Sequence, residues 1–123
     1  GYSHESAWSR GQAWGLYGYT LCYRYTKDKA YLKQAENIAK YIFTHKNLPA
    51  DLIPYWDFDA PGIPNEPRDV SAATVIASGL YELSKYSNNN NKFYVEKANT
   101  ILKNLSIKYI APKGTHKGFV LLH

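Results

Sequence analysis

The sequence has no methionine and a single cysteine among its 123 residues. One cysteine cannot form an internal disulfide, so we expect Cys22 to be a small residue of the hydrophobic core. Because methionine is missing even at position 1, we expect that the chain is not a complete translation product. No apolar run approaches the length of a membrane span, and no signal peptide is visible.

Long blocks of one charge are also absent, although the formal net charge is +5. Without a run of roughly five or more like charges, we expect neither nucleic acid nor a membrane as a partner. The scattered charges indicate a solvated surface and leave a bias toward an acidic ligand open. The histidines form no metal-ligand spacing, and there is no Gly-rich phosphate loop or nucleophile elbow. The sequence therefore predicts no metal site; the histidines are His4, His45, His116 and His123.

What the sequence does contain is typical of a folded domain. Hydrophobic residues make up 45% and charged residues 20%, which argues against disorder. Aromatic residues reach 15%, with 12 tyrosines and 3 tryptophans, a composition common in proteins that bind sugars or flat ligands.

Two uncharged helices are expected, over residues 9–25 and 70–86. The first has no charge between Arg10 and Arg24, and the second follows Asp69, a natural N-cap, with no charge in its first 12 residues. A helix that is apolar on every face is normally surrounded by other elements. We therefore expect both helices to be mostly buried.

Two amphipathic helices are expected over residues 29–45 and 92–109, each with one polar face exposed to solvent. The segment 31–38 resembles the segment 94–101, which begins 63 positions later. A repeated pairing of a mostly uncharged helix with an amphipathic helix indicates α/α hairpins. When such hairpins close into a ring, they form a barrel with an inner and an outer layer of helices. Two hairpins cannot close such a ring, so either more chain or a self-association partner must cover the inner helices.

A proline-rich loop over residues 46–68 joins the two hairpins, and a tail follows over residues 110–123. Five prolines between Pro49 and Pro67 predict an ordered, extended loop, since proline fixes φ and lacks a donor. The tail has the pattern of a loop followed by a strand. Long loops that retain aromatic and acidic residues often carry function.

The densest group of candidate site residues lies where the first helix begins. An arginine at that point, Arg10, needs either an anionic ligand or a structural ion pair with an acid, and the residues leave both readings open. The tryptophans on either side suit a flat ligand near a helix N-terminus, although core packing explains each equally well. The group reads Trp8-Ser9-Arg10-Gly11-Gln12-Ala13-Trp14.

Paired carboxylates are the usual catalysts of sugar hydrolysis, so each acid near the loop is a candidate. A structural role is the favoured interpretation for each of them, and Asp69 reads first as an N-cap. The candidates are Asp57, Asp59, Asp69, Glu5 and Glu66.

Taken together, the motifs resemble glycoside hydrolase family 88, the unsaturated glucuronyl hydrolases. The similarity covers nearly the whole chain, in order. It is carried by Gly1-Tyr2-Ser3, by Trp8 to Gly15, by Pro54-Tyr55-Trp56-Asp57-Phe58-Asp59-Ala60-Pro61 and by Ile63 to Asp69 followed by Ser71-Ala72-Ala73.

The resemblance implies an all-α fold, with residues 1–123 forming part of an (α/α)6-barrel catalytic domain. Members remove a 4,5-unsaturated uronic acid from the non-reducing end of oligosaccharides that polysaccharide lyases produce. An aspartate protonates the vinyl ether and helps to activate water, a second aspartate assists, and no metal or organic cofactor takes part. Both aspartates precede the matching segment, so the resemblance implies no catalytic residue in this chain. The family's substrate-binding residues carry over to Arg10, Trp14, Trp8 and Gln12.

Two other interpretations remain. One is the related unsaturated rhamnogalacturonyl hydrolase family, which has the same barrel and reaction but matches the aromatic loop less well. The other is a sugar-binding α/α domain without catalysis. The expected partners are an unsaturated uronate oligosaccharide and the rest of the barrel or a second copy. The expected compartment is the cytoplasm or the periplasm of a bacterium.

Overall fold

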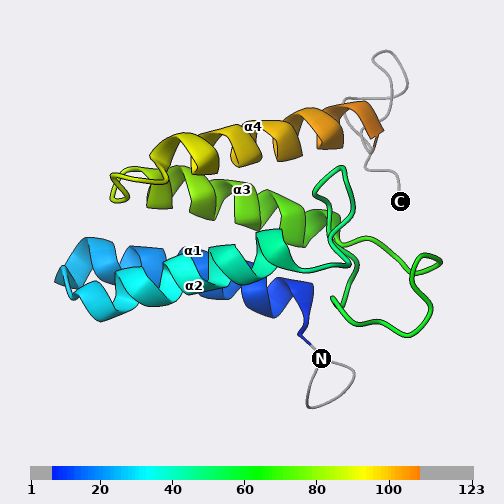
Figure 1. The fold of residues 1–123 in the computed structure, drawn as a ribbon, viewed down its shortest axis with the longest axis horizontal. Helices are drawn as coiled ribbons and strands as arrows, with labels where there is room; N and C mark the ends of the chain where they lie inside the picture. The colour runs from blue at the N-terminus through cyan, green and yellow to red at the C-terminus, as the bar shows by residue number, and fades with distance from the viewer. Residues whose placement is uncertain (1–6, 109–123) are drawn as a thin grey trace, which may run out of the picture.

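The computed structural model describes residues 7–108 and consists there of four α-helices without a β-strand (Figure 1). The helices are α1 (Ser9–Thr26), α2 (Lys29–Thr44), α3 (Val70–Ser84) and α4 (Asn91–Lys108). All four predicted helices are confirmed, with ends that differ by at most two residues. The predicted tail over 110–123 lies outside the described residues, as do Glu5, His4, His116 and His123.

Both hairpins owe their form to residues at the helix ends. Lys27 adopts a left-handed conformation (φ 59°) and donates its N–H to the Tyr23 carbonyl at 2.7 Å, which ends α1. The Asp28 side chain then accepts the Ala30 N–H at 2.9 Å and starts α2. Asp69 caps α3 by accepting the Ala72 N–H at 3.0 Å, as its position in the sequence predicted.

Helix α3 is the centre of the fold, since it packs against both α1 and α4 (Figure 1). Gly79 allows α1 to approach closely, because a Cβ at this position would lie 3.1 Å from Leu16 Cγ and 3.4 Å from Tyr17 Cα. Over half of α3 is buried, as predicted. Its buried residues are Val70, Ala72, Ala73, Ile76, Ala77, Gly79, Leu80 and Leu83.

Helix α1 departs from the prediction of general burial. Only Ser9, Ala13, Leu16 and Thr20 are buried, and aromatic side chains on the remaining surface are open to solvent. The physical reason is that α1 packs only against α2 and α3 within the described part of the chain. The prediction for Cys22 is wrong for the same reason, since its thiol lies on this open face.

The amphipathic helices match their predicted faces. In α2, Ala35, Ala39 and Ile42 are buried while Lys33 and Lys40 are exposed. In α4 the buried residues are Tyr94, Ala98, Ile101 and Leu105. None of the described helices combines the length and the apolar character that a membrane crossing requires.

The loop between the hairpins is ordered and extended, as the prolines predicted. Its central segment pairs on both sides, with antiparallel bridges Trp8↔Asp57 and Tyr55↔Arg68. Figure 1 shows the loop gathered at the end of the bundle where α1 and α3 begin. The loop therefore brings its aromatic and charged side chains to two helix N-termini.

Candidate functional site

An ion pair between an exposed arginine and a buried aspartate joins the beginnings of α1 and α3. Arg10 Nε donates to Asp69 Oδ2 at 2.9 Å, and the Arg10 side chain is 66% exposed while that of Asp69 is 8% exposed. The structural ion pair that the sequence left open therefore exists within the chain. This ion pair uses Nε alone, and the terminal nitrogens of Arg10 make no hydrogen bond to any residue within 7–108. They are therefore available to a ligand.

Asp69 carries out two tasks with its two oxygens. Oδ1 accepts the backbone N–H of Ala72 and Oδ2 accepts Arg10 Nε. A carboxylate is favoured at this point by the partial positive charge of the α3 N-terminus. The Arg10 guanidinium is consequently anchored at one edge while its other edge faces solvent.

Two adjoining hollows surround this ion pair. The smaller, of about 230 Å³, is lined by Trp8, Arg10, Trp56 and Asp69. The larger, of about 300 Å³, shares Arg10, Trp56 and Asp69 and adds Pro67, Arg68, Val70 and Ser71. Two indole rings, an arginine and hydroxyl-bearing or charged side chains thus meet at the N-terminal end of two helices. Such a set can hold a ring with an apolar face and an anionic group.

A second arginine of the loop, Arg68, is held by the protein itself. Its Nη1 donates to both oxygens of Asp51, at 2.8 and 3.0 Å, and to the Ile53 carbonyl at 2.9 Å. Burial alone would raise the pKa of Asp51, but hydrogen bonds from the Ile53 N–H and Arg68 outweigh it and leave the pKa below its ordinary value. This pair fixes the base of the loop.

Not all of the residues singled out in the sequence meet at this place. Trp8 and Arg10 line the same hollow, whereas Trp14 lines a separate one of about 260 Å³ on the open α1 face, with Tyr19 and Cys22. Trp14 is 58% exposed there. Gln12 is half-buried and lines neither hollow at Arg10.

The acidic side chains of the loop make contacts that hold the loop itself in place. Asp57 is fully buried and accepts the Asp59 N–H at 2.8 Å, while Asp59 pairs with His45 Nε2 at 3.3 Å. Glu66 accepts from the Trp56 indole. Within residues 7–108 no three histidine, cysteine or acidic side chains come together in a way that could hold a metal ion.

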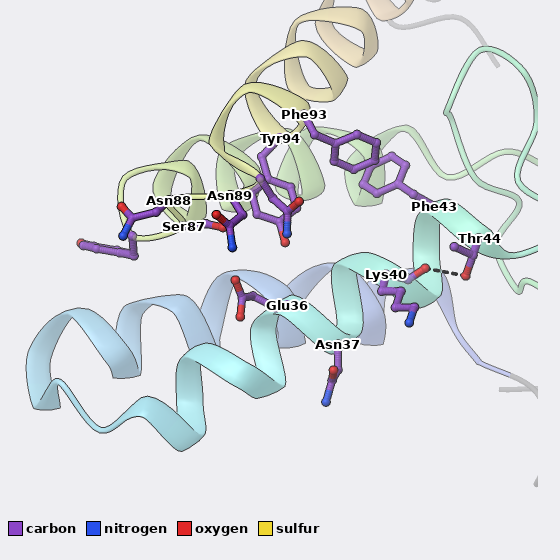
Figure 2. Close-up of a pocket in the computed structure, with 12 residues that line it drawn as sticks. Glu36, Asn37, Lys40, Phe43, Thr44, Ser87, Asn88, Asn89, Phe93 and Tyr94 are labelled. Carbon is purple, nitrogen blue, oxygen red and sulfur yellow. Dashed lines mark hydrogen bonds between the residues drawn. The ribbon is translucent and has the colours of Figure 1, made fainter.

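A further hollow, of about 750 Å³, is a groove between α2 and α4 (Figure 2). Glu36 and Lys40 reach it from α2, and Phe43 and Phe93 meet edge to face across it with ring centroids 5.8 Å apart. Burial raises the pKa of Tyr94 at its floor, so this hydroxyl stays neutral. None of the residues that the sequence singled out lies in this groove.

The sequence did not single out Trp56 as a site residue, and it singled out Asp69 only as a cap and a candidate acid. Asp69 was identified as a cap, which is correct, but its second oxygen could not be placed without the fold. The signal for Trp56 was the retention of aromatic residues in a long proline-rich loop.

The fold is a piece of an (α/α)6 barrel, and an arginine and two indoles lie together at one end of its hairpins. No protein-family model matches the chain. Known proteins identify the class more narrowly.

The chain is 46% identical over 124 residues to an unsaturated glucuronyl hydrolase of Formosa agariphila, a match that covers 100% of this chain and 30% of that protein. An unsaturated chondroitin disaccharide hydrolase of Streptococcus agalactiae is 41% identical over 86 residues, 70% of this chain and 21% of the relative. The crystal structure of an unsaturated glucuronyl hydrolase specific for heparin superposes with a TM-score of 0.87 at 48% identity, over 97% of this chain and 33% of that one.

The chain therefore belongs to the unsaturated glucuronyl hydrolase family. It spans about 30% of the length of the curated relatives with which it aligns from end to end.

Proposed function

We propose that residues 1–123 form part of the (α/α)6-barrel catalytic domain of an unsaturated glucuronyl hydrolase and supply substrate-binding residues to it. The reaction removes 4,5-unsaturated uronic acid from the non-reducing end of lyase-generated oligosaccharides by hydration of the vinyl ether. The observation that carries the proposal is Arg10, which is anchored through Nε while its terminal nitrogens are open between two tryptophans. One structural relative is complexed with dGlcA-GalNAc6S, which supports this substrate class.

Arg10 suits the carboxylate of a uronic acid. A guanidinium presents two parallel N–H groups to a carboxylate, a geometry that a lysine ammonium cannot reproduce. Because Asp69 holds Nε at 2.9 Å, the edge formed by the terminal nitrogens is oriented before the substrate arrives. Trp8 borders the same hollow. The proposal also includes Gln12 and Trp14, which lie outside the hollows at Arg10, as contacts that form in the complete barrel.

The proton donor lies outside this chain in this proposal. Asp57 is buried in the loop, Asp59 pairs with His45, and Asp69 is engaged by Arg10 and the α3 N-terminus. Donors of the protein itself hold these carboxyl groups, and Asp69, which borders both hollows, is engaged through both of its oxygens. The catalytic aspartates belong to other helices of the barrel.

The remaining helices of the barrel are also the partner of the open α1 face. An exposed aromatic surface of this kind is unfavourable in water by about 25 cal/mol for each Å² left uncovered. We expect the isolated chain to self-associate through this face, and light scattering measures this directly. A stable monomer over a wide concentration range would argue against the incomplete barrel.

A chimera tests the binding role of Arg10. Residues 1–123 replace the matching segment of the Formosa agariphila relative, and hydrolysis of an unsaturated glucuronyl disaccharide is followed by the loss of ultraviolet absorbance. Loss of one partner of a desolvated charge pair costs about 2–5 kcal/mol, so Arg10→Ala should lower kcat/KM by about thirtyfold or more. Arg10→Lys should recover little of this loss, because it restores the charge without the planar fork.

The matched control is Arg24→Ala, which removes the other arginine of α1. Arg24 pairs with Glu82 at 3.4 Å and lines neither hollow at Arg10. We expect unchanged kinetics for this variant. A normal Michaelis constant in a thermally destabilised Arg10→Ala chimera would show that Arg10 is only structural.

A further inference from the structure

Trp56 is the aromatic residue common to both hollows at Arg10. Trp8 borders only the smaller hollow, whereas Trp56 lines both, together with Arg10 and Asp69. A disaccharide that is held by Arg10 in one hollow can extend its second ring into the other. Its path then follows the Trp56 side chain whichever hollow takes the uronate.

Trp56 is held by two hydrogen bonds of its backbone and one of its side chain. Its backbone N–H donates to the Pro67 carbonyl and its carbonyl accepts the Ser9 N–H, both at 3.0 Å. Its indole Nε1 donates to Glu66 Oε1 at 2.9 Å. An aromatic ring that is immobilised beforehand loses little conformational entropy when a ligand stacks on it.

Glu66 is in turn fixed by the tight turn of the loop. Its Oε2 accepts the Gly62 N–H at 2.8 Å. A Cβ at Gly62 would lie 2.6 Å from the same oxygen, so the close approach of the carboxylate depends on glycine at this position. The two oxygens of Glu66 therefore tie the indole to the backbone of the turn.

The geometry points to Trp56 as the stacking platform for the sugar bonded to the uronate, with Glu66 as the residue that positions its ring. This inference rests on the proposed function. A pyranose has an apolar face of C–H groups that packs on an indole, while its hydroxyls remain free for water. Arg10 then recognises the charge of the substrate and Trp56 recognises the leaving sugar.

Two substrates separate these contacts in the chimera described above. One is an unsaturated glucuronyl disaccharide, and the other is the methyl glycoside of the same unsaturated uronic acid, which lacks the second sugar. Loss of one stacking contact is worth about tenfold, so Trp56→Ala should lower kcat/KM for the disaccharide by about tenfold. For the methyl glycoside, kcat/KM should change by less than about twofold, since the contacts to the uronate remain.

The controls distinguish this inference from the proposed function. Tyr25→Ala removes an aromatic side chain that is 76% exposed on α1. This variant should leave kcat/KM unchanged for both substrates. Arg10→Ala should lower kcat/KM for both substrates, since both carry the carboxylate. An equal loss of both substrates in Trp56→Ala, or no loss of either in a folded chimera, overturns the role of Trp56. If Arg10→Ala affects neither substrate, the proposed function itself fails.

A double-mutant cycle tests Glu66 separately. If Glu66 acts through the indole, Glu66→Ala lowers kcat/KM for the disaccharide by about threefold in the parent chimera and has no further effect once Trp56 is alanine. A merely structural Glu66 would give the same loss in both backgrounds and on both substrates. That additive result would overturn its positioning role.

Discussion

Helices α1 and α3 each have a long uncharged stretch and look alike in sequence, but they differ in the structure. Helix α3 packs against α1 on one side and α4 on the other, and over half of its residues are buried. Helix α1 has α2 and α3 as neighbours, and the aromatic side chains of its remaining face are exposed. Apolar composition thus marks a surface that needs cover, and burial follows only where a neighbour supplies it.

The largest expected effect is the difference in the free energy of unfolding between a side-chain truncation in α3, which leaves a cavity, and one on α1. Ile76 is fully buried, so Ile76→Ala should lower the free energy of unfolding by about 2–5 kcal/mol. Tyr19 is 37% exposed, and Tyr19→Ala should cost less than about 1 kcal/mol. Denaturant titration of dilute residues 1–123 measures both, because in the chimera the other helices of the barrel would cover α1. Equal losses would show that α1 is as well covered as α3.

A pair of alanine substitutions should sharpen the same contrast with opposite signs. A side chain at Gly79 meets Leu16 and the α1 backbone, so Gly79→Ala should destabilise by about 1–2 kcal/mol. A side chain at Gly18 meets nothing within 4 Å, so Gly18→Ala should stabilise α1 by about 0.5–1 kcal/mol. Thermal unfolding of both variants gives the signs. Stabilisation by both would contradict the close packing of α1 on α3.

An effect similar in size to that of Gly79→Ala is expected at the base of the loop, and it depends on pH. The pKa of Asp51 is lowered in the folded chain from 3.8, so its stabilising contribution is present above the unfolded-state value and is lost as pH falls through the folded-state value. Asp51→Asn should cost about 1–2 kcal/mol at neutral pH and little in strong acid. Unfolding measured from neutral pH down to acid tests this. A loss that is independent of pH would contradict the ion pair with Arg68.

Much of the fold could be predicted from the sequence because its signals are local. Helical spacing, the Asp69 cap and the prolines of the loop identified four helices and an extended connection. Burial of α1 and of Cys22 could not be predicted in the same way, since it depends on which helices lie beside α1. Trp8 and Arg10 were singled out by residue type. Trp56 joined them only through backbone pairing between distant segments, the Trp8↔Asp57 bridge and the hydrogen bond from the Ser9 N–H to the Trp56 carbonyl.

The most direct measurement compares the isolated chain with the chimera in one assay, the loss of ultraviolet absorbance of the 4,5-unsaturated uronate. We expect the chimera to hydrolyse the unsaturated glucuronyl disaccharide and residues 1–123 alone to show no turnover, because in the proposed function the chain supplies binding residues and not the proton donor. Turnover by the purified chain would contradict this assignment and would make an acid within it, such as Asp57 or Asp59, catalytic. A folded but inactive chimera would contradict the proposed function as a whole.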